Sequence, residues 1–243
     1  MAEEEFYNEE IARLRDSLFR KTSSAEIFND YFFSLIGKYL KNGQTILDIG
    51  TGNGYVLSEL LNRFPEYSLN LFGIDHSSAM VNRSKKLLEG KAFIYFGDNS
   101  KLPYEEDSFD LVTAKNVTLI CIPEIKRVLH KNSYFIFREY GQGKGLVEVA
   151  DLFPKSRLIR SRDLDYYVFQ LKENNFEIEL AEQHKIKRAY SQEELIKIVK
   201  SFPFIKEFSK EDEKNILNKF NTSLEEITSD PLVIVARRKN YEI

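Results

Sequence analysis

Between residues 44 and 140, short apolar runs alternate with longer stretches in which apolar residues recur every three or four positions. The short runs predict strands, and the longer stretches predict helices that pack one face on a sheet. Because strands that alternate with helices form a parallel sheet covered on both faces, this pattern predicts an α/β fold. The expected strands lie near 45–49, 69–74, 92–97, 109–114 and 133–138, and the expected helices near 54–64, 77–88 and 122–130.

The pattern on either side of this segment is looser but still periodic. Residues 6–42 predict two helices with apolar faces, separated by the polar run Thr22-Ser23-Ser24. Beyond Gly145 we expect a helix over 164–174, a strand over 176–187, a helix that begins at the capping box of Ser191, a helix over 209–220 and a strand over 231–237.

The most informative interruption follows the first expected strand, in the run Asp48-Ile49-Gly50-Thr51-Gly52-Asn53-Gly54. Glycine permits a positive φ and lets a ligand lie against backbone N–H groups. Residues 55–61 resume a helical spacing, so a strand, a glycine-rich turn and a helix N-terminus follow one another, as in nucleotide sites. Tyr55 stands where a dinucleotide fingerprint has its third glycine, and the sequence contains no Walker P-loop motif.

The pattern D-x-G-x-G-x-G over 48–54 resembles motif I of the class I S-adenosylmethionine-dependent methyltransferases. Three further segments are similar to later motifs of that family and follow in the same order. The apolar run over 70–75 ends in Asp75, and the run over 92–98 ends in Asp98. The fourth segment, over 107–114, contains the S-F-D sequence followed by apolar residues that is typical of the family's fourth strand.

The resemblance implies a Rossmann-like, seven-stranded, mostly parallel sheet in the order 3-2-1-4-5-7-6, with an antiparallel seventh strand and a helical cap. Residues 1–243 would then form a single methyltransferase domain. Residues 6–42 would form an N-terminal helical cap, and residues 191–220 a helical insertion between the last two strands. Both would lie over the carboxyl ends of the strands, where open α/β sheets bind their ligands.

The resemblance also implies S-adenosylmethionine as cofactor and S-adenosylhomocysteine as product. In the family, the residues matching Asp48, Asp75 and Asp98 position the glycine loop, bind the ribose and accept from the adenine amine. Simpler roles remain open, because Asp48 could be a turn residue, Asp75 could cap a helix and Met80 could belong to the core. The expected cofactor-binding residues are Asp48, Gly50, Thr51, Gly52, Gly54, Asp75, His76, Met80, Asp98, Asn99 and Lys115.

Substrate residues are expected at the ends of the fourth and fifth strands, at Asn116, Glu139 and Tyr140. Glu139 could bind an amine or act as a base, and Arg138 could equally neutralise it in a structural role. This region departs from the family pattern, since Asn132-Ser133 replaces a pair of glycines and the preceding helix is short. No catalytic residue is assigned, because proximity and orientation account for most of methyl transfer.

The amino-acid composition limits which ligands and macromolecules the protein is expected to bind. The 243 residues carry a formal net charge of −3, which argues against broad non-specific binding of nucleic acid. Three scattered histidines and the single Cys121 give no metal-site pattern, so no metal is expected. The acidic start and the lack of a long apolar run predict no secretory signal and no membrane span, and hence a cytoplasmic protein.

We therefore expect methyl transfer to a small molecule, at an O, N, S or C atom, by in-line displacement. An RNA or protein methyltransferase is the first alternative. It would need a basic face that joins the clusters Arg157, Arg160 and Arg162 with Lys185, Lys187 and Arg188. The second alternative is a non-catalytic S-adenosylmethionine-binding protein of the same fold.

Overall fold

The computed structural model describes residues 10–11, 13–14, 23–117, 119–159, 162–202 and 204–240. The chain divides into two compact units. The first, here called the sheet unit, comprises residues 29–139, 165–182 and 233–243. The second, the ribbon unit, comprises residues 1–28, 140–164 and 183–232.

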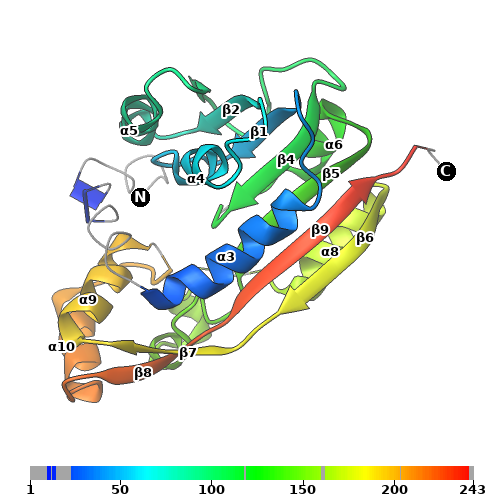
Figure 1. The fold of residues 1–243 in the computed structure, drawn as a ribbon. Coiled ribbons are helices and arrows are strands. Elements are labelled where there is room, and N and C mark those ends of the chain that lie inside the picture. Colours follow the sequence, from blue (N-terminus) through cyan, green and yellow to red (C-terminus); the bar gives the residue numbers. More distant parts are fainter. Residues whose placement is uncertain are drawn as a thin grey trace. The chain divides into compact units, whose positions relative to one another are not determined.

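Seven strands form the main sheet in the order β3-β2-β1-β4-β5-β9-β6, which confirms the predicted order because β9 is its seventh strand along the chain (Figure 1). Strand β1 pairs in parallel with β2 and β4, β2 with β3, and β4 with β5. In Figure 1, β9 runs opposite to β4 and β6. The strands are β1 Thr45–Ile49, β2 Asn70–Asp75, β3 Phe93–Phe96, β4 Phe109–Lys115, β5 Leu129–Tyr140, β6 Phe176–Gln183 and β9 Pro231–Arg238.

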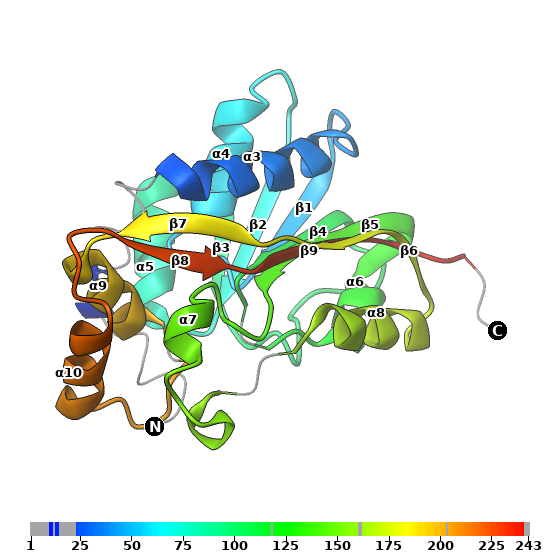
Figure 2. The same cartoon turned by 90° about the horizontal axis from the view of Figure 1, so that it is seen from below.

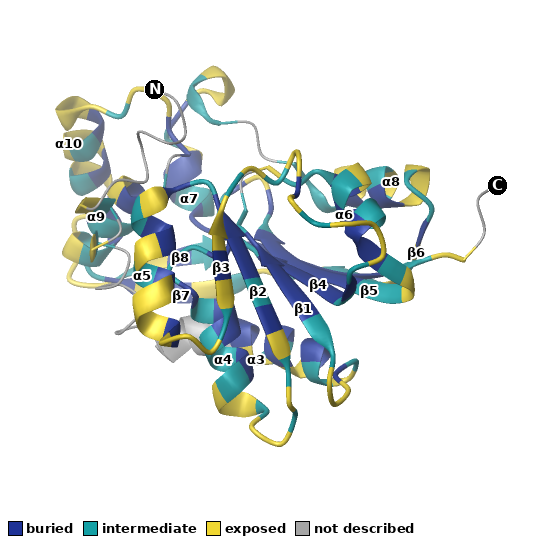
Figure 3. Ribbon diagram, turned by 90° about the horizontal axis from the view of Figure 1, so that it is seen from above, coloured by how far each residue is buried: buried dark blue, intermediate teal, exposed yellow. Residues whose placement is uncertain are grey.

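The central strands are apolar over nearly their whole length because helices cover both faces of the sheet. Four of the five residues of β1 are buried, as Figure 3 shows for β1 and its neighbours. Helices α3 and α4 lie on one face, and α6 and α8 lie on the other (Figure 2). The helices with residues in the sheet unit are α3 Ser23–Gly37, α4 Tyr55–Arg63, α5 Ser78–Leu88, α6 Ile122–Val128 and α8 Leu164–Glu173.

Residues 29–37 of α3 pack along the sheet face beside β5 and β6. The Tyr31 hydroxyl donates to Glu182 at 2.9 Å, and the Tyr39 hydroxyl, just beyond the helix, donates to Glu179 at 2.9 Å. Arg63 of α4 forms an ion pair with Asp30 at 2.7 Å. These contacts fix α3 and α4 on the same side of the sheet.

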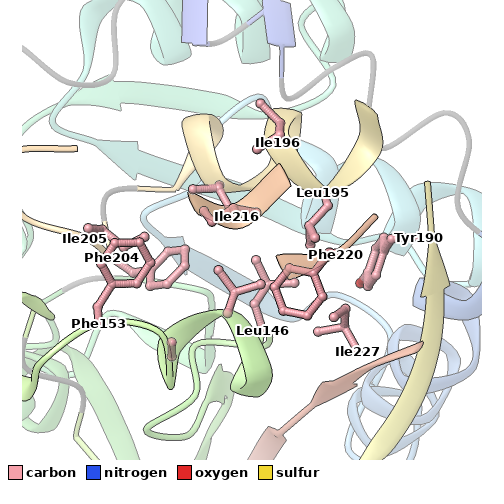
Figure 4. Close-up of a cluster of buried hydrophobic side chains, with 13 residues drawn as sticks. Leu146, Phe153, Tyr190, Leu195, Ile196, Phe204, Ile205, Ile216, Phe220 and Ile227 are labelled. Atoms are coloured by element: carbon pink, nitrogen blue, oxygen red, sulfur yellow. The ribbon is translucent and has the colours of Figure 1, made fainter. Parts of the chain in front are cut away.

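The ribbon unit is built around the antiparallel pair of strands β7 Ile186–Tyr190 and β8 Glu225–Ser229. Its core gathers apolar side chains from the ribbon and from the helices around it, including Leu146, Tyr190, Leu195, Phe220 and Ile227 (Figure 4). Beyond residue 140, the described helices of this unit are α7 Val147–Ala150, a 3-10 helix Lys155–Arg157, α9 Gln192–Ser201 and α10 Lys210–Lys219.

Several elements differ from expectation. The strand predicted over 176–187 is two strands, since β6 ends at Gln183 and β7 begins at Ile186 and pairs with β8. Strand β8 itself was not expected. Strand β5 begins at Leu129, four residues early, with an irregularity in its pairing to β4.

Two further observations concern the ends of the chain and its apolar content. Only residues 10, 11, 13 and 14 of the first predicted N-terminal helix are described, in helical conformation, and the rest lies outside the described residues. Within the described part of the chain, no helix combines the length and the hydropathy that a membrane span requires.

Candidate functional site at the carboxyl ends of the strands

The loop between β1 and α4 has the left-handed backbone that its glycines predict. Gly52 has a φ of 56° and Gly54, the N-cap of α4, a φ of 85°. The two glycines differ in what a side chain would meet. A Cβ at Gly54 would lie 3.1 Å from Leu88 and Ser84 of α5, so this glycine allows the helices to pack closely. Among the described residues, a Cβ at Gly52 would meet only the Gly50 carbonyl oxygen, at 4.0 Å, so this backbone faces open space.

Asp75 ties this loop to the end of β2. Its Oδ2 accepts from the Gly52 N–H at 2.8 Å, and its Oδ1 accepts from the Ser77 N–H at 2.9 Å. Ser77 in turn caps α5. The buried carboxylate therefore does organise a helix start, as the simpler interpretation held. Each oxygen keeps a second lone pair, so the capacity to accept from a ligand hydroxyl is not exhausted.

Asp48 is a buried carboxylate near the end of β1, with 1% of its surface exposed. The Thr113 hydroxyl of β4 donates to its Oδ1 at 2.8 Å. Burial raises the pKa of Asp48 from 3.8 to about 7, although the bond from Thr113 and the charge of Lys115 oppose that rise. A positively charged ligand group near this carboxylate would stabilise its ionised form.

The end of β4 meets the end of β5. Lys115 places its Nζ 4.9 Å from the centre of the Tyr55 ring. The Asn116 N–H donates to the Arg138 carbonyl at 2.9 Å, and the Asn116 side-chain oxygen accepts from the Arg138 guanidinium. Arg138 is thus engaged with Asn116, and the neighbouring Glu139 is buried.

The remaining predicted cofactor residues occupy the loop after β3 and the start of α5. Asp98 is exposed, and its Oδ1 accepts from the Ser100 N–H at 2.8 Å. The Asn99 amide donates to the Leu119 carbonyl, which joins the loops after β3 and β4. Met80 is buried in α5, and His76 is half-buried with its Nδ1 4.0 Å from Asp75 Oδ1.

The structure therefore links the loops after β1 and β2 directly, through Gly52 and Asp75. Because parallel strands end at one edge of a sheet, the loops after β3, β4 and β5 share that edge. Tyr140 belongs to the ribbon unit, where its ring lies against Gly145.

Three supporting contacts were not anticipated. Thr113 holds Asp48, Arg138 holds Asn116, and Val117 lies so close to Gly50 that a Cβ there would be 2.7 Å from its Cγ2. Thr113 and Arg138 are polar residues within apolar strand segments, a signal that each needs a partner. The partner of Thr113 is 65 residues away, so only the sheet register identifies it.

A family model described as a methyltransferase domain matches residues 40–221. The chain is 32% identical over 76 residues to the biotin biosynthesis bifunctional protein BioHC of Teredinibacter turnerae, and 38% identical over 65 residues to the protein-L-isoaspartate O-methyltransferase of Cytophaga hutchinsonii. These matches span 28% and 26% of this chain. They span only 13% and 28% of the length of these curated relatives.

Solved structures share the fold at low identity. The YcgJ protein of Bacillus subtilis is similar with a TM-score of 0.64 and 16% identity, over 88% of this chain and 100% of that one. A phosphoethanolamine N-methyltransferase of Haemonchus contortus, in complex with phosphomonomethylethanolamine and S-adenosylhomocysteine, is similar with a TM-score of 0.58 and 16% identity. The likeness covers 87% of this chain and 53% of that one.

Proposed function

The chain belongs to the methyltransferase-domain family, and from that premise we propose that it transfers the methyl group of S-adenosylmethionine to a small-molecule acceptor. The observation that carries the proposal is the backbone at Gly52. Its left-handed φ, the open space where a Cβ would stand and the bond of its N–H to Asp75 make a firmly held surface that a ligand can approach closely.

The residues at this edge fit the proposed cofactor. The loop over 50–54 would lie along its methionine part, and Asp75 would accept from its ribose hydroxyls. Asp98 and Asn99 would lie near the adenine. When bound, the cofactor supplies an activated methyl group on a sulfonium. The presence of S-adenosylhomocysteine in a neighbour of the same fold supports this choice of cofactor.

The chain's own contribution would be orientation and charge. Asp48 is a buried carboxylate whose ionised form lacks solvation, so a cationic ligand nearby would favour that form. Glu139 and Asn116, at the ends of β5 and β4, would meet the acceptor.

A small acceptor is favoured over RNA because three residues of the two basic clusters are paired with carboxylates or buried. Arg157 is paired with Asp212 at 2.7 Å, and Lys187 with Glu148 at 3.2 Å. Arg188 is buried. Arg160, which belongs to the first cluster, lies outside the described residues.

The test compares two glycine substitutions, both at positions with a left-handed φ. Gly43 precedes β1, at the opposite end of that strand, with a φ of 81° and no heavy atom within 4 Å of a built Cβ. Both Gly52→Ala and Gly43→Ala should cost about 1–2 kcal/mol of stability, the cost of a left-handed conformation for an L-residue. Only Gly52→Ala should weaken the binding of S-adenosylhomocysteine in calorimetry, because only there does the methyl occupy the ligand's space.

A loss of more than about tenfold in affinity for Gly52→Ala, with Gly43→Ala unchanged, supports the proposed cradle. Equal affinities in both folded variants would show that the cofactor does not contact this loop. The proposed site would then be wrong.

A further inference from the structure

The ribbon of β7 and β8 has one buried and one exposed face. Arg188 pairs directly with Ile227, so their side chains share a face, and successive residues alternate between the faces. Ile227 and Tyr190 are buried on that face, whereas Lys187 and Ala189 are exposed on the other. Arg188 is therefore a guanidinium on the apolar, inward side of the ribbon, where a charge needs a compensating partner.

Arg188 has only 7% of its surface exposed. The hydroxyls of Tyr140 and Tyr190 form hydrogen bonds with its guanidinium. The Nε and Nη2 atoms are buried and have no hydrogen-bond partner. Among the described residues, no carboxylate forms an ion pair with Arg188. Within the described part of the chain, the positive charge is thus buried without a counter-ion.

The two atoms without partners lie on the same edge of the guanidinium. This edge is the fork that binds a carboxylate or phosphate through two parallel N–H···O bonds. Ser229 adds a hydroxyl that is fully buried and has no hydrogen-bond partner. It follows Ile227 by two residues on the same face, a diagonal position that places it about 7 Å from Arg188, within reach of the long side chain.

We propose that Arg188, with Tyr140, Tyr190 and Ser229, forms a binding site for the oxyanion of a small ligand, a carboxylate or a phosphate group. An oxyanion would satisfy both edge N–H groups and neutralise the buried charge, whereas a water molecule would do only the first. If the proposed methyl transfer is correct, the natural ligand of this site is an acidic substrate; that extension rests on the proposed function, and the site itself does not.

The test measures the thermal unfolding of the full chain with sodium acetate or sodium phosphate, at ionic strength held constant with sodium chloride. The two salts represent the two sources of the oxyanion. Arg188→Met removes the charge and the fork at similar volume. Lys187→Met, on the exposed face of the same strand, is the matched control.

The wild-type chain and Lys187→Met should show a saturable rise in unfolding temperature with at least one of the two anions. Arg188→Met should bind about 100-fold more weakly, because two charge-assisted hydrogen bonds are lost. It should still bind S-adenosylhomocysteine like the wild type, which separates this site from the cofactor site. Failure of the wild type to bind S-adenosylhomocysteine would contradict the proposed function and leave the oxyanion site standing.

Equal responses of the wild type and Arg188→Met to both anions, or no saturable response of the wild type, would overturn the site. If Arg188→Met does not fold, Arg188→Lys decides the question. It keeps the charge but lacks the planar fork, so it should bind the anion at least tenfold more weakly. An unchanged affinity in Arg188→Lys would refute the bidentate site.

Discussion

Asp48 should make the protein less stable as the pH rises from about 4 to about 7. Burial raises the pKa of this carboxyl from 3.8 to about 7 in the folded state. Between these values the unfolded chain releases the proton while the folded chain keeps it, so the free energy of unfolding falls with pH. Over this interval of about three pH units, the free energy of unfolding should fall by about 4 kcal/mol.

Asp48→Asn removes this titration and keeps an oxygen that can accept from the Thr113 hydroxyl. The stability difference between Asp48→Asn and the wild type should therefore shift in favour of the variant by about 4 kcal/mol between about pH 4 and about pH 8. Urea unfolding at a series of pH values measures this difference directly.

Thr113 provides an internal control, because its bond to Asp48 opposes the rise in pKa. Thr113→Val should raise the pKa of Asp48 further and extend the loss of stability to higher pH, whereas Thr113→Ser, which keeps the hydroxyl, should behave like the wild type. A difference between Asp48→Asn and the wild type that does not vary with pH, or that moves in favour of the wild type as the pH rises, would refute the reasoning.

Three further predictions concern other parts of the molecule. Asp75→Ala should destabilise the chain by about 1–3 kcal/mol in urea unfolding, because the buried N–H group of Ser77 loses its acceptor, whereas the half-buried N–H group of Gly52 can turn to water; Asp75→Asn, which keeps one oxygen, should lose less, and equal losses would argue against this bonding. Ser209→Ala should cost about 1 kcal/mol because the Ser209 hydroxyl caps α10 by accepting from the Asp212 N–H, while the Asp212 carboxylate accepts from the Ser209 N–H; the exposed Lys210→Ala serves as control, and an equal cost in both would exclude a capping effect. Addition of S-adenosylhomocysteine should slow hydrogen exchange in residues 48–54, because the cofactor would cover this loop; unchanged exchange there would place the cofactor elsewhere.

The sheet could be predicted from the sequence because its signals are local. Each of the first four strands is an apolar run that ends in an acidic or polar residue, and the glycine run marks the turn after β1. The outer elements lack such signals. Periodicity continues through Gln183 and His184, so it cannot show that β6 ends there and that β7 pairs elsewhere. Strand β8 has only one buried apolar residue, Ile227, so its alternation is too weak to recognise.

Asn132 and Ser133 stand where the family pattern has a pair of glycines. Asn132 has a φ of 63°, in the left-handed region that asparagine tolerates better than most residues. A left-handed backbone at this position of β5 therefore does not require glycine.

The same distinction, between local signals and contacts distant in sequence, applies to the residues of the candidate site. The glycine loop and Asp75 could be identified from spacing, because their roles depend on backbone conformation and strand ends. The supporting bond from Thr113 to Asp48 could not be identified from the sequence, because these two residues meet only through the register of β1 with β4. The sequence places Arg188 in a basic cluster and suggests a surface position, because a sequence shows the charge of a residue but not which face of the ribbon it occupies.

The central claim is tested most directly by incubating the full chain with S-adenosylmethionine labelled in its methyl group and a whole-cell extract, then separating small molecules, RNA and protein. The account predicts label in the small-molecule fraction with the wild type and with Gly43→Ala, and a strong reduction with Gly52→Ala. Label confined to RNA or protein would contradict the small-molecule acceptor, and no label in any fraction despite cofactor binding would contradict methyl transfer itself.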